Sequence, residues 1–276
     1  MRAGAVRRGV LLAIVIACVL AVDFPLLWMP LSSVKPFREL FASPPLIVPR
    51  EVTFRHYADL FARTNFPTYF MNSAIVCVGT VVVALAPSVP AAYAVTRYRF
   101  RGREVFAQAC LVIYMFPPVF LAIALFVLLV KAGLSNTYAG LILTHTTFAL
   151  PFSIWLLRTC FRAIALELEE AAWVDGAGRW RAFWYVVWPL ALTGIIATGI
   201  FTAILSWNEY LFALILMLGE AMKTLPVGVS LFMEASSVEW GLIMAAAVLV
   251  SVPAVGVFVL MHRYVVQGMS VGALKE

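Results

Sequence analysis

Residues 167–189 read ELEEAAWVDGAGRWRAFWYVVWP, the longest polar interruption in the second half of an otherwise apolar chain. A short helix is predicted by four residues at the spacing i, i+4, i+7 and i+8, which share one helix face: Ile164, Leu168, Ala171 and Ala172. Asp175-Gly176 predicts a turn, because glycine adopts the left-handed conformation that ends a helix and aspartate can cap the next one. The stretch thus predicts two helices joined by a sharp turn, the second entering apolar sequence after Pro189. This shape suits docking onto a partner protein.

The composition is typical of a membrane protein. Hydrophobic residues make up 63% of the 276 residues, charged residues 12%, and the mean hydropathy is +0.97. A soluble domain is about half apolar and a quarter charged, so a soluble core could not bury this much apolar surface. The net charge of +6 does not indicate a nucleic-acid partner, because the basic residues lie in short loops beside apolar runs. A lipid bilayer is the expected surrounding.

Six apolar runs are long enough for transmembrane helices, and we predict an all-α membrane protein with one transmembrane domain over residues 1–276. The predicted spans are approximately residues 10–31, 68–95, 105–130, 137–157, 187–218 and 240–261. The third is interrupted at Pro117-Pro118. The fifth exceeds the need of a bilayer, so it should tilt, project into the cytoplasm or break near Ser206-Trp207-Asn208. It also carries a small-residue stripe at every fourth position: Gly194, Thr198, Thr202 and Ser206.

The basic residues predict the orientation. Cytoplasmic loops of membrane proteins are enriched in Lys and Arg. In the proposed topology 13 of the 20 basic residues lie on one side. That side holds both termini, the loop at residues 97–103 and the loop at residues 158–186. Six spans with both termini in the cytoplasm are therefore expected.

No catalytic or metal site is predicted. The chain has no Gly-Lys dipeptide and so no Walker A phosphate loop, which would place any ATP on another subunit. Its three histidines are far apart in the topology, and His145 is expected to be a core residue. Acids embedded in spans are few, namely Asp23, Glu104 and Glu209. Their scarcity counts against an ion-driven carrier, and whether Asp23 is structural or functional stays open.

Neutral polar and aromatic side chains in the spans suggest a path for a sugar. Hydroxyl and amide groups hydrogen-bond sugars, and aromatic faces stack on them. The candidate residues for the substrate path are Asn72, Tyr114, Thr144, Trp207, Asn208 and Tyr210. The alternative for each one taken singly is a helix–helix contact.

One spaced pattern resembles a known family. The chain has Glu170-Ala171-Ala172, three residues, Gly176, nine residues, Val186, one residue and Trp188-Pro189. This resembles the "EAA" loop of ABC importer permeases, which has Ile and Leu at the two substituted positions. The neighbouring Asp175 and Ala177 fit the sugar-importer version, although Thr193 stands where that version has a second proline. The tail around Gln267, Gly268, Gly272 and Lys275 resembles the ending of maltose-type permeases.

The resemblance implies an ABC importer type I permease core in a prokaryotic inner (cell) membrane. The chain would form a heterodimer with a second permease, and an extracytoplasmic sugar-binding protein would deliver the sugar. An ATPase dimer, carrying the ATP and Mg, would dock on the coupling loop 158–186 and contact the tail. The coupling residues would be Glu170, Ala171, Ala172, Asp175, Gly176, Ala177 and Pro189.

Three alternatives remain open at this point. The first is an ABC permease for a non-sugar solute such as a polyamine or a phosphonate. The second, from a different class, is a stand-alone ion-coupled carrier or channel. An integral membrane enzyme is the third, and the lack of a carboxylate pair or metal cluster counts against it.

Overall fold

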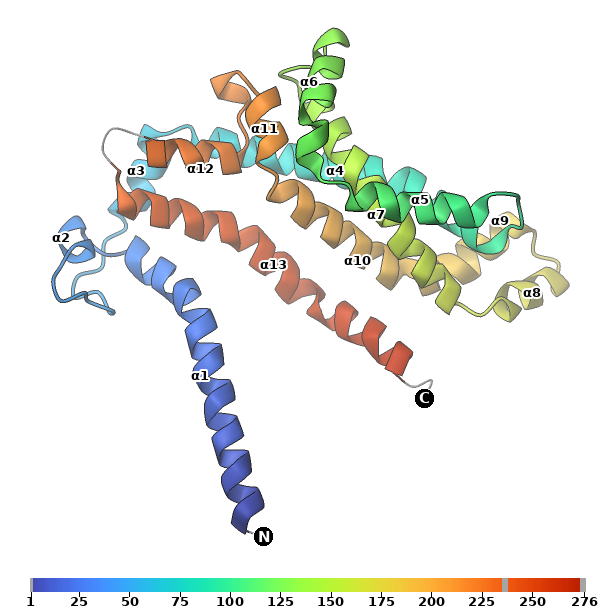
Figure 1. Ribbon diagram of the computed structural model, residues 1–276, viewed down its shortest axis with the longest axis horizontal. Coiled ribbons are helices and arrows are strands. Elements are labelled where there is room, and N and C mark those ends of the chain that lie inside the picture. The colour runs from blue at the N-terminus through green and yellow to red at the C-terminus, as the bar shows by residue number, and fades with distance from the viewer. Residues whose placement is uncertain (1, 235–237, 274–276) are drawn as a thin grey trace. The chain divides into compact units, whose positions relative to one another are not determined.

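The computed structural model describes the backbone of residues 2–234 and 238–273, with side chains for most positions from 11 to 259 (Figure 1). Every regular element in these ranges is a helix. Five helices are long and apolar enough to cross a membrane, and a sixth crossing results when one bent pair is counted as a single span. The chain forms two compact units, Met1–Pro67 with Gly228–Pro253, and Thr68–Val227 with Ala254–Glu276.

The first unit begins with the long apolar helix α1 (Arg2–Ser33), followed by two short helices, α2 (Phe37–Leu40) and α3 (Arg55–Arg63). Lys35 holds the intervening loop in place. Its buried ammonium donates a hydrogen bond to the Leu46 carbonyl at 2.5 Å and lies 4.2 Å from the centre of the Trp28 ring. Burial lowers the pKa of this ammonium, and the Glu39 carboxylate opposes the shift. The sequence pattern did not predict α2 or α3, because their apolar residues are too few for a span.

The second unit holds most of the elements between α3 and α12. Its elements are α4 (Phe66–Arg97), α5 (Arg103–Met115), the 3-10 turn η1 (Pro118–Leu121), α6 (Ala122–Lys131), α7 (Tyr138–Ala163), α8 (Glu167–Val174), α9 (Arg179–Ala182), the π-helical turn η2 (Phe183–Val187), α10 (Trp188–Trp207), α11 (Leu211–Leu216) and the 3-10 turn η3 (Glu220–Met222). Two further helices, α12 (Leu225–Glu234) and α13 (Trp240–Ala273), begin in one unit and end in the other. Helix α7 packs against α5, α10 and α11 (Figure 1).

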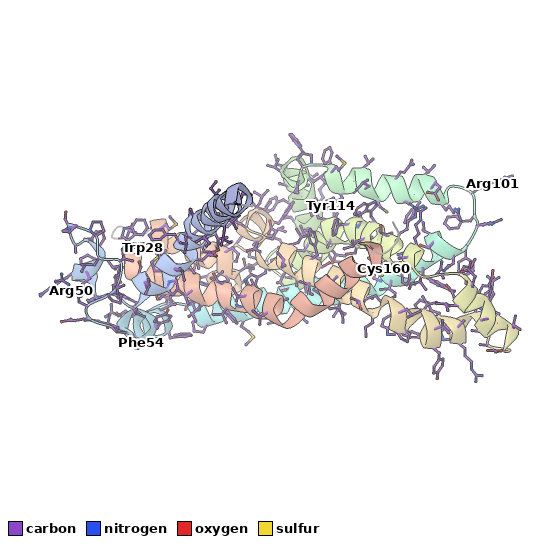
Figure 2. All side chains as sticks on the ribbon, turned by 90° about the horizontal axis from the view of Figure 1, so that it is seen from below. Trp28, Arg50, Phe54, Arg101, Tyr114 and Cys160 are labelled. Atoms are coloured by element: carbon purple, nitrogen blue, oxygen red, sulfur yellow. The ribbon has the colours of Figure 1, made fainter. Side chains whose placement is uncertain are left out.

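The predicted interruption at Pro117-Pro118 is confirmed as a sharp bend. Helix α5 ends at Met115, and the segment Pro118–Lys131 leaves it at an angle of 91°. Two physical causes act together: Pro118 disfavours helical backbone at the preceding residue, and neither proline has an N–H to continue the helix. Figure 2 marks Tyr114 close to this bend and Arg101 in the loop between α4 and α5.

The small-residue stripe is the face of α10 that packs on α7. Thr198 and Thr202 are fully buried, and the hydroxyl of Thr202 lies 3.2 Å from that of Ser153 on α7. A Cβ atom at Gly194 would lie only 2.1 Å from the Cys160 sulfur, so this approach of the two helices requires glycine. The small residues of the stripe therefore let α7 and α10 approach closely, as such residues do between membrane helices.

Both ends of α10 depart from a regular α-helix. At its start, the Trp188 N–H donates to the Phe183 carbonyl, five residues back, and Pro189 has no N–H to donate. At its far end the helix stops at Trp207, and α11 starts only at Leu211. The fifth predicted span was expected to tilt, to project into the cytoplasm or to break near Ser206-Trp207-Asn208. The structure shows the break.

Candidate functional site

The segment after α7 forms a helix, a tight turn and a second helix. Helix α8 ends at Val174 with Asp175 as its C-cap, and Gly176 follows with φ of +81°. The Ala177 N–H donates to the Ala172 carbonyl at 2.9 Å, and the Gly176 N–H donates to the Trp173 carbonyl at 3.1 Å. This is the double bond pattern of a Schellman ending, in which glycine supplies the left-handed residue. The predicted turn at Asp175-Gly176 is confirmed.

The prediction that Asp175 caps the following helix is wrong. Asp175 is the C-cap of α8, and the N-cap of α9 is Gly178, whose carbonyl accepts a hydrogen bond from the Ala182 N–H at 2.9 Å. Two further residues, Gly176 and Ala177, separate the caps because the Schellman turn needs them before the chain can start a new helix.

The predicted apolar face of this helix is also wrong. Ile164 is the C-cap of α7 and lies outside α8, and the Leu168 side chain is 47% exposed. The fully buried residue of α8 is Glu169. A carboxylate can be buried when charged and hydrogen-bonding partners replace water, so the burial of this face follows from pairing and not from apolar spacing.

Helix α4 supplies the partners of Glu169. The Arg97 Nε donates to Oε1 of this carboxylate at 2.5 Å, and the Tyr93 hydroxyl donates to Oε2 at 2.6 Å. A second Arg97 nitrogen, Nη2, donates to the Ile164 carbonyl at 2.8 Å. These contacts attach the start of the segment to the end of α4. Sequence reasoning missed the role of Glu169, although a basic residue at the end of a neighbouring span was a usable signal.

Arg179 attaches the second half of the segment. Its guanidinium carbon lies 5.4 Å from the centre of the Tyr98 ring and 5.3 Å from that of Trp173. Cation–π contacts at such distances are favourable. Nearby, Glu104 on α5 forms ion pairs with Arg158 and Arg162 at the end of α7. The segment is therefore fixed to α4, and the adjoining ends of α5 and α7 are fixed to each other.

The predicted coupling residues lie on the outside of this framework. Glu170, Ala171, Asp175, Gly176 and Pro189 are exposed, and Ala172 and Ala177 are half-buried. Nothing lies within 4 Å of a Cβ atom placed on Gly176, so its neighbourhood is open and its constraint is the backbone angle. These residues are accessible to a partner.

The predicted tail residues lie at the end of α13. The helix continues to Ala273, beyond the end of the sixth predicted span at 261, and includes Gln267, Gly268 and Gly272 by backbone. The Gln267 side chain and all of Lys275 lie outside the described residues.

A cavity of 590 Å³ lies between the bend after α5, the middle of α7 and the break after α10. It brings together three of the six predicted path residues, Tyr114, Asn208 and Tyr210. Phe148, His145 and Glu209 also line it. The wall thus combines aromatic faces with hydrogen-bonding groups, the lining expected for a polar ligand of moderate size.

The other three predicted path residues pack elsewhere. The Asn72 amide accepts from the Tyr138 hydroxyl at 2.6 Å and donates to two backbone carbonyls of residues 221 and 223. The Thr144 hydroxyl donates to the Gly140 carbonyl one turn back. Trp207 is buried and packs edge-on against Phe70. None of them lines the cavity: Asn72 holds the turn at residues 221–223, Thr144 bonds within α7, and Trp207 packs on α4.

His145 and Glu209 are residues of the cavity wall that the predicted path omitted. The His145 ring has Nδ1 2.8 Å from the Ser206 hydroxyl and Nε2 3.2 Å from Oε2 of Glu209. The Glu209 carboxylate also accepts from the Phe212 N–H at 2.8 Å and the Ala213 N–H at 3.0 Å. The expectation of a core histidine is half right, since His145 is buried and paired but also reaches the cavity. No cluster of three metal-ligating side chains occurs in the described part of the chain.

Known proteins match this chain over most of its length. The family described as "Binding-protein-dependent transport system inner membrane component" matches residues 88–271. The Escherichia coli K12 protein "Inner membrane ABC transporter permease protein YcjP" is 34% identical over 254 residues, 91% of each chain. The Thermococcus litoralis "Trehalose/maltose transport system permease protein MalG" is 32% identical over 278 residues, 100% of this chain and 99% of the relative.

Another relative and one solved structure also match this chain over most of its length. The Mycobacterium tuberculosis "Trehalose transport system permease protein SugB" is 36% identical over 253 residues, 91% of this chain and 92% of the relative. A chain of a bacterial ABC transporter for alginate import has a TM-score of 0.78 at 24% identity, with 95% and 96% of the two chains covered. That likeness extends the shared fold beyond the residues matched by the family. The chain belongs to the family of binding-protein-dependent transport system inner membrane components, and it is a multi-pass permease subunit of the ABC importer class.

Proposed function

We propose that this chain is one of two permease subunits of an ATP-driven sugar importer in a prokaryotic inner membrane. It forms the translocation pathway with a second permease. An extracytoplasmic binding protein delivers the sugar, and a separate ATPase dimer binds ATP and Mg. The relatives named for trehalose and maltose support a sugar as the solute.

The observation that carries the proposal is the segment of residues 158–186. Its buried side is fixed to α4 through Glu169, while Glu170, Asp175 and Gly176 face outward. This segment is firmly attached to α4 and its outer face is exposed. Movement of an ATPase docked on that face would therefore be transmitted to the membrane-spanning helices. ATP moves the permease only if it binds one arrangement more tightly than the other.

The cavity supports the substrate class. Sugars present hydroxyl groups and flat apolar faces, and Tyr114, Asn208 and Tyr210 offer partners for both. The second permease would complete the wall of the cavity. We propose that these three residues contact the sugar as it crosses.

Reconstitution tests the proposal. Proteoliposomes would hold this chain, its second permease, its ATPase and its binding protein, and uptake of labelled trehalose and maltose would be measured with ATP inside. Uptake that needs all four components supports the proposal. Transport by this chain alone on an ion gradient contradicts it, and ATP-driven uptake of a polyamine or phosphonate in place of sugars would refute the sugar class.

Orientation is tested separately. In a cysteine-free background, Leu168→Cys is labelled in intact cells with a membrane-impermeant maleimide. If the segment is cytoplasmic, Leu168→Cys should be labelled only after the membrane has been permeabilised. Val48→Cys, in the opposite loop and also exposed (68% against 47% for Leu168), is the control and should label at once. The reverse pattern would contradict a cytoplasmic coupling segment.

A further inference from the structure

A second cavity, a groove of 870 Å³, runs between α4 and the segment that leads from α9 into α10. Its α4 wall includes Val81, Leu85 and Ala94, and its opposite wall includes Trp184 and Trp188. These residues belong to helices that are apolar enough to span a membrane. No residue lines both this groove and the cavity around Tyr114.

The groove has the length of one lipid chain. From Val81 to Ala94 the α4 wall extends for about 20 Å, since an α-helix rises 1.5 Å per residue. One leaflet of the hydrocarbon core is about 15 Å thick. An acyl chain lying along α4 would therefore have apolar wall beside it through the whole leaflet.

One end of the groove has the composition of a membrane interface. Trp180, Trp184 and Trp188 recur at every fourth position, and neighbouring ring centres are 5.7 and 4.7 Å apart. Trp180 and Trp184 are 72% and 41% exposed. Tryptophan is enriched where the hydrocarbon core meets the headgroups, so these rings mark the level of the headgroup.

A cation lies at the same end. Arg179 lines the groove beside Tyr98, over whose ring its guanidinium lies. None of the ion pairs among the described residues includes Arg179. In contrast, Arg97 close by is neutralised by Glu169. The groove thus combines an apolar slot with one positive charge at its interfacial end.

We propose that the groove binds an anionic phospholipid, with an acyl chain along α4 and the headgroup phosphate on Arg179. Basic pockets between membrane helices bind anionic headgroups, and arginine is well suited to phosphate. A free phosphate would make no use of the apolar slot. A packed apolar helix of another subunit would fill the slot but would give Arg179 no anionic partner. Bound in this way, the lipid links α4 to the segment that carries Trp173 and Arg179.

Native mass spectrometry of the full-length chain tests the proposal. The protein is purified in a neutral detergent and mixed with equal amounts of palmitoyl-oleoyl-phosphatidylglycerol and palmitoyl-oleoyl-phosphatidylcholine. We expect the chain to retain the anionic lipid about fivefold over the zwitterionic one, the ratio expected from one basic residue near the membrane surface. Equal retention of the two lipids would overturn the proposal.

Four variants locate the site. Arg179→Gln should reduce the ratio to about one, whereas Arg179→Lys, which keeps the charge, should preserve the preference. The matched control Arg181→Gln, two residues away and outside the groove, should also preserve it. Ala86→Trp fills the slot and should lower retention of both lipids. Equal ratios for Arg179→Gln and Arg181→Gln would overturn the proposal.

A photocrosslink in native membranes identifies the occupant directly. A benzophenone side chain at position 86 should form an adduct with phospholipid. An adduct with another segment of protein in place of lipid would show that a helix fills the groove, and it would overturn the proposal.

Discussion

Two carboxylates of the second unit are held in different ways, and the difference separates the segment of residues 158–186 from the cavity around Tyr114. Glu169 is fully buried, and its partners Tyr93 and Arg97 lie on another helix, α4. Glu209 keeps 19% of its side chain exposed and is bound mainly by N–H groups of the helix that follows it. The first carboxylate therefore joins two elements, and the second shapes one local turn. Removing Glu169 should release a whole segment, whereas removing Glu209 should disturb only the break after α10.

The largest expected effect follows from removing Glu169. Glu169→Ala leaves Arg97 without its buried partner and should lower the free energy of unfolding by about 3 kcal/mol. Thermal unfolding of the full-length chain in detergent measures this. The matched control Glu167→Ala removes an exposed acid of the same turn and should change stability by less than about 0.5 kcal/mol. Equal effects of the two substitutions would contradict the joining role of Glu169.

A smaller loss is expected at the turn of the segment. Gly176→Val places a β-branched residue at φ of +81°, which should cost about 2 kcal/mol. The chain should still insert in the membrane, but sugar uptake should no longer follow ATP hydrolysis. Gly178→Ala is the control, because Gly178 has φ of −66° and open space around it. Full uptake by Gly176→Val would count against a coupling role for this turn.

The second carboxylate should matter less for stability. Glu209→Ala removes the acceptor for two N–H groups at the start of α11 and should cost about 1 kcal/mol, as loss of a helix cap does. A double-mutant cycle with His145→Ala should give a coupling energy of about 1 kcal/mol, because the two side chains are in contact. Strictly additive effects would mean that the contact between His145 and Glu209 contributes nothing.

The smallest effect on stability is expected at the exposed acid of the segment. Glu170→Lys should change the free energy of unfolding by less than about 0.5 kcal/mol. It should nevertheless reduce the amount of ATPase that co-purifies with the permease. Glu167→Lys makes the same charge change at a neighbouring exposed position. Unchanged ATPase recovery with Glu170→Lys, or an equal loss with both variants, would show that Glu170 has no specific contact.

The sequence predicted features that depend on local backbone chemistry. Gly176 after Asp175 indicated the turn, and the two prolines indicated the interruption of the third span, because both effects act within a few residues. The angle of 91° at the prolines was not predictable, since packing between helices decides it. The same limit explains Glu169, because apolar spacing cannot reveal a buried charge whose partner lies 72 residues earlier.

The sequence did not show which of the candidate path residues share a cavity, for a similar reason. Residue type selected six residues for a substrate path; Tyr114, Asn208 and Tyr210 line the cavity, whereas Asn72, Thr144 and Trp207 do not. Only their neighbours set Asn72 and Thr144 apart from the residues that line the cavity. Asn72 hydrogen-bonds backbone carbonyls of another segment, and Thr144 hydrogen-bonds a carbonyl of its own helix, α7. His145 was expected to lie in the core because a single histidine in an apolar span usually does. Its place in the wall follows from the break after Trp207, which brings Glu209 within reach.

The π-helical turn Phe183–Val187 sets the rotation of the whole of α10. An α-helix turns by about 100° per residue, and a π-turn accommodates one residue more than an α-turn does. Deleting one residue between 183 and 187 would let a regular α-helix run through this point. Everything downstream would then be rotated by about a quarter of a circle, and Ser206 and Thr202 would leave the face that meets α7. One surplus residue just before α10 therefore decides which side chains, some 20 residues later, line the cavity.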